Sequence, residues 1–257
     1  MEILSTHSAS SAQAFVEEAT RVVDAAKEKS LVLRIMGATA VRIHCPKFSY
    51  LHDVLQREIT DIDFIGYRKQ NSDVLKLLDA LGYVSDKRLL FMGRYLFENP
   101  NNRRHIDIFF DKLEFCHTID FKGRLEIDYP TISLSDIFLQ KMQIVQINEK
   151  DIRDVMVMLR EHEIGDATKE AIESGYISDL LSNDWGFYYT VTTNLGKVKA
   201  FLPEYRGLSS EDRSDISAKI DHLSRAIEEH EKSVRWKIRA KTGTRQRWYK
   251  EVDETGL

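Results

Sequence analysis

Apolar residues recur with a helical period near the amino terminus and with a strand period further on. In the segment 10–29 the apolar positions share one helical face: Phe15, Val16, Ala19, Val22, Val23 and Ala26. This spacing predicts a first amphipathic helix. The apolar run 31–36 then predicts a short buried strand ending at Gly37, and 38–44 is expected to open a helix. A polar and aromatic connection follows from 45 to 58.

A strand period begins at residue 60, where Asp61 and Asp63 alternate with β-branched and aromatic residues. Such alternation is typical of a half-buried strand. From there to residue 129 the pattern predicts a helix over 72–81 closed by Gly82, strands at 83–84, 89–97 and 103–110 with a turn at 98–102, and short strands between 113 and 129.

The pattern becomes helical after Pro130. Ser133 or Ser135 can cap a helix that runs to Val145, and another helix is expected to begin near Lys150. Further helices with short polar breaks are expected as far as about Trp236. The fold class is therefore α/β (α+β), with an α/β domain over 1–130 and a helical bundle over 131–257 that ends in a basic segment.

Composition agrees with a globular chain and excludes several classes. The 257 residues are 42% hydrophobic and 30% charged, and no apolar run approaches the roughly 20 residues that span a bilayer. The first residues lack the basic start and apolar core of a signal peptide. Two cysteines, Cys45 and Cys116, give neither a disulfide framework nor a metal spacing. We expect a reduced, cytoplasmic protein without a membrane partner.

The net charge of −4 conceals a strongly basic segment at 232–250. It holds eight basic residues and no acidic one: Lys232, Arg235, Lys237, Arg239, Lys241, Arg245, Arg247 and Lys250. Trp236, Trp248 and Tyr249 are interleaved with them. Basic groups with aromatics suit the backbone and unstacked bases of a nucleic acid, so tRNA or another RNA is a candidate partner. The alternatives are a solvated helix end whose aromatics pack on the core, and an edge that binds an acidic partner.

The candidate chemistry centres on three carboxylates. Asp61 and Asp63 are two apart on one strand, so their side chains project from the same face. Asp107 lies in the strand 103–110 and would join them if the two strands are neighbours. Carboxylates held together repel one another unless a cation compensates. Oxygen clusters of this kind bind hard divalent cations. The remaining coordination positions of such a cation can be filled by phosphate oxygens. The pattern predicts a site of phosphoryl or nucleotidyl transfer.

A small-residue turn precedes this strand. Gly37, Ala38 and Thr39 link the strand 31–36 to the helix that follows. Glycine lets the backbone approach a ligand, the first amides of a helix attract anions, and the Thr39 hydroxyl could reach a phosphate oxygen. Alone this is a weak signal, because small residues occur at many such turns.

Taken together, these motifs resemble the polymerase-β-like nucleotidyltransferase superfamily. The Gly37 turn, the Asp61–Asp63 strand and the later Asp107 follow its order. The segment from Arg57 through Thr60 to Asp63 is similar to the R-x-x-[ST]-D-h-D motif (h, apolar) of AbiEii-like nucleotidyltransferase toxins. Lys141, followed by the run 150–154, is similar to that family's late helical motif. The resemblance covers about 30–160, and Ala38 departs from the family's usual Gly-Gly or Gly-Ser turn.

The resemblance implies a Mg²⁺- or Mn²⁺-dependent enzyme with an N-terminal nucleotidyltransferase-type mixed sheet. Asp61, Asp63 and Asp107 would hold the metal, and Asp107 could also act as a base. The residues implied for nucleotide binding are Gly37, Ala38, Thr39, Arg57, Thr60, Lys141, Asp151 and Asp154. Of these, Lys141 would bring charge to the triphosphate. Asp151 and Asp154 would hold Lys141 or Arg57, or would only match the charge of a helix N-terminus.

Three functions remain open on the sequence. The first is transfer of a nucleoside monophosphate from an NTP to a hydroxyl, on a tRNA 3′ end or a protein side chain, and this includes the toxin of a toxin–antitoxin pair with an antitoxin partner. The second is a catalytically silent nucleotide-binding or interaction module, against which the retention of Asp61, Asp63, Asp107 and Lys141 argues. The third is a small-molecule nucleotidyltransferase of the antibiotic-modifying kind. No Walker A, G-x-S-x-G or zinc-type histidine pairing occurs.

Overall fold

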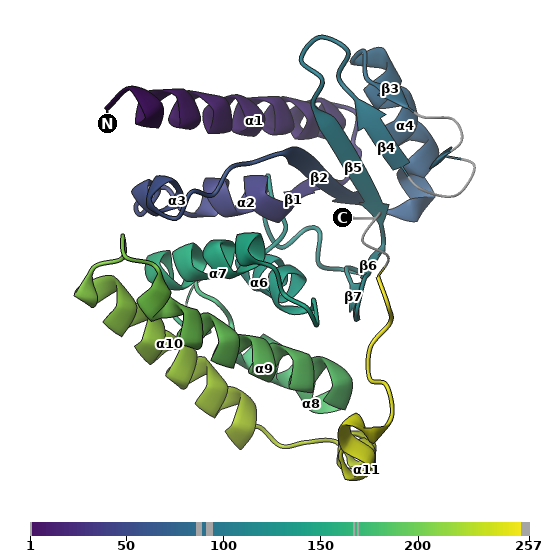
Figure 1. The fold of residues 1–257 in the computed structure, drawn as a ribbon. Coiled ribbons are helices and arrows are strands. Elements are labelled where there is room, and N and C mark those ends of the chain that lie inside the picture. Colours follow the sequence, from purple (N-terminus) through teal and green to yellow (C-terminus); the bar gives the residue numbers. More distant parts are fainter. Residues whose placement is uncertain (1, 86–88, 91–94, 167, 169, 253–257) are drawn as a thin grey trace. The chain divides into compact units, whose positions relative to one another are not determined.

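The chain divides into two compact units (Figure 1). The computed structural model describes residues 2–85, 89–90, 95–166, 168 and 170–252, with side chains from residue 12 onward. The sheet unit comprises Met1–Ser49, Gln56–Leu113 and Asp120–Ser133; the helical unit comprises Tyr50–Leu55, Glu114–Ile119 and Leu134–Leu257. No described helix is long and apolar enough to cross a membrane.

The sheet unit is built on a mixed five-stranded sheet with the order β1-β2-β5-β4-β3. Its strands are β1 (Leu33–Met36), β2 (Asp61–Gly66), β3 (Val84–Ser85), β4 (Tyr95–Glu98) and β5 (His105–Phe110). β2 and β5 are parallel, and the other neighbouring pairs are antiparallel. The mixed sheet with many helices confirms the predicted α/β (α+β) class.

One face of the sheet forms the core of this unit. Ile62, Phe64 and Ile106 are fully buried, and each alternates with a residue that points to the opposite face. Two helices, α1 (Glu2–Glu28) and α4 (Asn71–Ala80), pack together on the core side, as Figure 1 shows. The apolar face predicted for the first helix is confirmed, since Ala19 and Val22 are fully buried.

The remaining elements of the sheet unit are short. Helix α2 (Gly37–His44) follows β1 without a loop, and the 3-10 turn η1 (Arg68–Gln70) precedes α4. Gly82, with φ +87°, closes α4 as predicted. The hairpin β6 (Lys112–Glu114) and β7 (Thr118–Asp120) lies where the chain passes between the units.

The predicted strand 89–97 is too long. Leu89 and Leu90 are helical, the strand starts only at Tyr95, and 91–94 lie outside the described residues. Leucine is a strong helix former, so the apolar run that starts at Leu89 does not distinguish a strand from a helix.

The helical unit contains α3 (Tyr50–Val54), α6 (Leu134–Met142), α7 (Glu149–Glu161), α8 (Ser174–Asn183), α9 (Trp185–Phe201), η2 (Leu202–Glu204), α10 (Ser210–Glu229), α11 (Val234–Thr242) and η3 (Gly243–Arg245). Side-chain caps start α7, α9, α10 and α11. Asn148, Asp184 and Ser233 each accept a backbone N–H of the first turn, and Ser209 forms a capping box with Asp212.

Helix α6 ends three residues before the predicted Val145. Asn194 of α9 is fully buried, and its Nδ2 donates to the carbonyl oxygens of Met142 and Ile144, at 3.0 and 2.8 Å. A side chain distant in sequence thus satisfies carbonyl groups at the helix end. Because the capping residue is supplied by another helix, the local pattern could not reveal it.

Candidate active site

The acidic residues of the sheet unit lie on one face of two parallel strands. In the register of β2 and β5, Asp63 is opposite Asp107, and Asp61 is opposite His105. Neighbouring strands are about 4.8 Å apart, so paired residues present their side chains side by side. All three carboxylates are partly accessible, whereas the residues between them are buried in the core. The predicted neighbourhood of the two acidic strands is therefore present.

Gly37 forms a close seat for the Asp63 carboxylate. It has φ +68°, and a Cβ added to it would lie 2.0 Å from Asp63 Oδ2. Met36, the residue before it, pairs with Asp63 across β1 and β2. Because a side chain at 37 would require both a left-handed backbone and displacement of the carboxylate, glycine is required there. The turn and the acidic strand are thus directly in contact.

Thr39, in the first turn of α2, carries an orphaned hydroxyl. Its side chain is 1% exposed, and Oγ1 has no hydrogen-bond partner in the described part of the chain. Ala38 is also buried, and the residue before α2, Met36, offers no side-chain cap. Buried hydroxyl groups are nearly always hydrogen-bonded, so this one is suited to a ligand oxygen. The small side chain of Ala38 leaves its backbone N–H in place.

The donor set of the sheet face fits a hard divalent cation. Carboxylate oxygens are the ligands that Mg²⁺ and Mn²⁺ prefer. Among the described residues of the sheet unit, no three acidic, histidine or cysteine ligand atoms all lie within 4.8 Å of one another. Mutual repulsion separates carboxylates that share a face, and a bound cation would favour their approach. Asp61, Asp63 and Asp107 thus offer the right chemistry in an open arrangement.

Arg57 and Thr60 flank the start of β2 differently. Arg57 is 6% exposed, and its guanidinium donates to the Glu58 carbonyl oxygen. Arg42 donates to the Arg57 carbonyl oxygen at 2.6 Å, which fixes this connection from the other side. Thr60 is exposed. The guanidinium therefore helps to hold the segment that leads into the acidic strand.

Lys141, Asp151 and Asp154 form a buried cluster inside the helical unit. Lys141 Nζ lies 2.9 Å from Asp151 Oδ1 and 3.0 Å from Asp154 Oδ2, with side-chain exposures of 9%, 14% and 1%. The cluster joins the last turn of α6 to the first turns of α7. Both carboxylates contact Lys141, and Asp151 also lies in the first turn of α7, where it matches the charge of the helix N-terminus.

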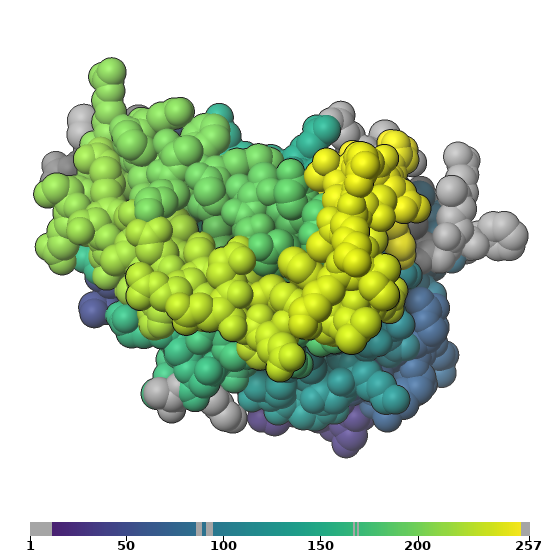
Figure 2. Space-filling model, turned by 90° about the horizontal axis from the view of Figure 1, so that it is seen from below, coloured from purple at the N-terminus to yellow at the C-terminus, as the bar shows by residue number. Residues whose placement is uncertain are grey.

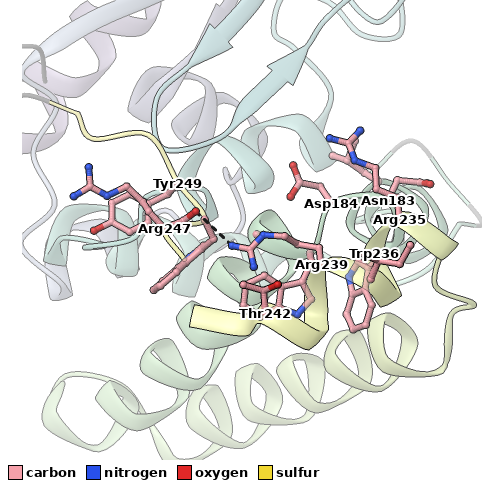
Figure 3. Close-up of a pocket in the computed structure, with 13 residues that line it drawn as sticks. Asn183, Asp184, Arg235, Trp236, Arg239, Thr242, Arg247 and Tyr249 are labelled. Atoms are coloured by element: carbon pink, nitrogen blue, oxygen red, sulfur yellow. Dashed lines mark hydrogen bonds between the residues drawn. The ribbon is translucent and has the colours of Figure 1, made fainter. Parts of the chain in front are cut away.

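The basic segment lies on the surface of the helical unit, where it is yellow in Figure 2. Helix α11 has no buried residue, and together with the chain from η3 to Tyr249 it borders a pocket of about 650 Å³ (Figure 3). The pocket is lined by Leu180, Asn183, Asp184, Trp185, Gly186, Arg235, Trp236, Ile238, Arg239, Thr242, Arg247, Trp248 and Tyr249. The sequence prediction did not include the wall that α8 and α9 contribute.

Comparisons with known proteins place few constraints on identity. No protein-family model matches the chain, and no curated protein matches it. Among solved structures the chain is similar to the antibiotic-resistance factor ANT(2'')-Ia, whose solution structure reveals substrate-regulated conformation dynamics. The identity is 14% and the TM-score 0.33, with 85% of this chain and 96% of that chain covered. The functional argument therefore rests on the geometry of this chain.

Proposed function

We propose that this protein is a metal-dependent nucleotidyltransferase, which moves a nucleoside monophosphate from an NTP to an acceptor hydroxyl. One observation carries the proposal. Asp63 and Asp107 are opposite each other on parallel strands, Asp61 lies on the same face, and Gly37 seats the Asp63 carboxylate. The turn at Gly37 would bind the phosphates, and the acidic face would bind the metal ion. A metal–triphosphate substrate requires both parts, and here the two are in contact.

Asp61, Asp63 and Asp107 are the residues that would hold Mg²⁺, or Mn²⁺ in its place. When bound, the metal would neutralise charge on the phosphates and favour an in-line displacement. The backbone N–H groups of Gly37 and Ala38 and the Thr39 hydroxyl would bind phosphate oxygens. The orphaned Thr39 Oγ1 supports this assignment.

The transfer step balances with these groups. The acceptor oxygen attacks the α-phosphorus of the NTP, a new P–O bond forms, and the bond from the α-phosphorus to the bridging oxygen breaks. Pyrophosphate leaves with the bonding electron pair. Asp107 is proposed to take the proton of the acceptor hydroxyl, because a carboxylate beside the nucleophile is a suitable base.

The roles of Arg57, Thr60 and Lys141 toward the nucleotide stay predictions. Arg57 holds the entry to β2 through the Glu58 carbonyl oxygen, so it is proposed to position Asp61. The charge of Lys141 is already balanced by Asp151 and Asp154. A contribution from Lys141 to triphosphate binding would therefore be additional to its role in joining α6 to α7.

The acceptor and the cellular role follow from the resemblance. A tRNA 3′ end or a protein side chain would supply the hydroxyl, and the protein would be the toxin of a pair with an antitoxin. The basic and aromatic segment 232–250 favours RNA. Expression in a bacterial host tests the toxin role: growth should stop with the native chain and resume with Asp61→Ala. Equal growth with both chains would contradict it.

The activity is tested with radiolabelled NTPs, Mg²⁺ or Mn²⁺, and either total tRNA or cell lysate. We expect label on RNA or on protein, and its loss when EDTA is added or when Asp63→Asn replaces the native chain. The matched control is Asp79→Asn, which removes an exposed carboxylate on α4 of the same unit. Full activity of Asp63→Asn would contradict the metal site. No label with any NTP and acceptor would favour the silent module.

A further inference from the structure

The pocket of the helical unit has a rigid frame built by its own side chains. Arg239 donates to the carbonyl oxygens of Gly243 and Gln246, each at 2.8 Å, and its guanidinium lies 4.8 Å from the Trp185 ring centroid. A further bond runs from Arg239 to the Arg247 backbone, the dashed line in Figure 3. One arginine thus fixes α11, the turn that follows it and the start of α9 to one another. Because this frame is already ordered, a ligand that binds here would lose little affinity to the conformational entropy of the lining residues.

The final aromatic stretch closes the pocket from the other side. The Trp248 indole donates to Thr190 Oγ1 at 3.1 Å, and its ring contacts Tyr189 with centroids 5.1 Å apart. A Cβ added to Gly186 would lie 2.5 Å from the Trp248 carbonyl oxygen, so glycine permits this approach. Trp248 therefore has a structural role. For this one residue of the basic segment, the alternative that its aromatics pack against the core holds.

Two further arginine side chains, those of Arg235 and Arg247, line the pocket outside this frame. Arg235 is exposed and pairs with no carboxylate among the residues that the structure describes. Arg247 is 60% exposed; it pairs with an exposed glutamate, Glu251, at 2.7 Å, and its guanidinium lies 5.9 Å from the Tyr249 ring centroid. The one acidic lining residue, Asp184, is occupied in capping α9. The pocket therefore carries a net positive charge that its own structure does not need.

Helix α11 also presents apolar surface to solvent next to these arginines. Val234 and Ile238, one turn apart, are 73% and 63% exposed. The indole of Trp236 lines the pocket and meets the Tyr188 ring in an edge contact, with centroids 5.0 Å apart. Its buried Nε1 has no hydrogen-bond partner among the described residues. An acidic peptide would need only the charge, whereas a stacked base would also use an aromatic ring and apolar edges. The combination favours a nucleic acid.

We propose that this pocket binds single-stranded nucleic acid, with one unstacked base beside Trp236 and Tyr249 and the flanking phosphates on Arg235 and Arg247. A volume of about 650 Å³ is sufficient for a base with its sugar. The proposal extends the proposed function, because it names the surface where an RNA acceptor is held. Binding itself needs neither the NTP nor the acidic strand.

The test is fluorescence anisotropy with a labelled single-stranded RNA of about 12 nucleotides, without NTP or metal. At about 50 mM salt we expect a Kd below about 100 µM. The affinity should fall as salt rises to about 200 mM. Arg235→Glu should raise Kd at least about tenfold, and Trp236→Leu about fivefold or more. Lys237→Glu is the matched control, since this exposed lysine of α11 makes the same charge change outside the pocket. Its Kd should change less than about threefold.

Several results would overturn the proposal. These are the absence of binding, equal losses with Arg235→Glu and Lys237→Glu, equal affinity for duplex RNA, or equal affinity for polyglutamate. Single-stranded DNA of the same sequence distinguishes recognition of the ribose from recognition of base and phosphate. Circular dichroism and thermal unfolding of each variant exclude a folding defect. Asp63→Asn should bind as the native chain does, so a failure of transfer and a failure of binding are separable.

Discussion

The two acidic clusters of this protein contain similar groups and differ in accessibility. In the helical unit Asp151 and Asp154 close on the ammonium of Lys141, and Asp154 is 1% exposed. In the sheet unit Asp61, Asp63 and Asp107 lie on a partly accessible sheet face beside a glycine turn. In the first cluster both carboxylates contact one buried ammonium. The second keeps its carboxylates partly accessible.

Because of this difference, we expect the buried cluster to affect the stability of the fold and the acidic face to affect the proposed transfer reaction. A buried ion pair that is complete contributes little net stability, yet removing one partner is costly because a charge is left behind in the interior. Asp61, Asp63 and Asp107 are only partly buried, so replacing one of these carboxylates with an amide of the same shape should cost less. Substitutions in the two clusters should therefore have opposite profiles in folding and in transfer.

The largest effect on folding is expected for Lys141→Met. Methionine keeps the length of the side chain but leaves Asp151 and Asp154 without their ammonium, so the free energy of unfolding should fall by about 3–5 kcal/mol. Urea denaturation measures it. The double variant Lys141→Met with Asp154→Leu is the control and should recover part of the loss. A single variant as stable as the native chain would show that the cluster does not behave as a buried ion pair.

Acid should weaken the helical unit through His117. Burial lowers the pKa of this imidazole to about 4, from an ordinary value of 6.5. As pH falls below 6.5, the His117 imidazole becomes protonated in the unfolded chain but stays neutral in the folded chain. The stability that the neutral imidazole contributes is therefore complete above pH 6.5 and is lost as pH falls toward 4. Between pH 7 and 5 the loss should be about 2 kcal/mol.

His117→Gln tests this pH dependence. Glutamine has no proton to take up in this range, so urea denaturation at the two pH values should show a difference smaller by about 2 kcal/mol than in the native chain. The subtraction removes the contribution of the other acidic groups. An unchanged difference would contradict the role of His117.

Gly37→Ala sharpens the account of the acidic face. The substitution should cost about 1–2 kcal/mol for a left-handed alanine and should also displace the Asp63 carboxylate, so transfer should fall about tenfold or more. Gly82→Ala is the matched control, because Gly82 has φ +87° and nothing within 4 Å of an added Cβ. Similar destabilisation with normal transfer is expected there. Loss of transfer in both variants would mean that strain alone explains the effect.

The sequence predicted the acidic face because its determinants are local. The alternation around Asp61 and Asp63 sets their common face, and the run from His105 to Phe110 has the same period. Gly37 could be predicted as a turn residue, but its contact with Asp63 depends on the pairing of β1 with β2, which no local pattern encodes.

Contacts between distant segments account for what the sequence did not predict. The end of α6 depends on Asn194, and the pocket wall depends on Trp185 and Gly186, all remote from the segments that they complete. The division of the chain also assigns 50–55 and 114–119 to the helical unit, which a linear reading of the pattern does not show. Most element types were predictable from periodicity, but the expected connection 45–58 contains helix α3 and the expected strand 89–97 begins with helical residues. Element ends and partners were set by packing.

The smallest effect on folding is expected for Asp63→Asn, and it completes the comparison. Asparagine keeps the shape of the side chain on an accessible face and removes one of the repelling charges, so the free energy of unfolding should change by less than about 1 kcal/mol. Transfer should nevertheless fall at least about 100-fold, because the amide is a poor ligand for a hard cation. Urea denaturation and the labelled-NTP assay on the same preparation measure both quantities. A strongly destabilised Asp63→Asn would show that this carboxylate supports the fold as Lys141 does, and the contrast between the clusters would then be wrong.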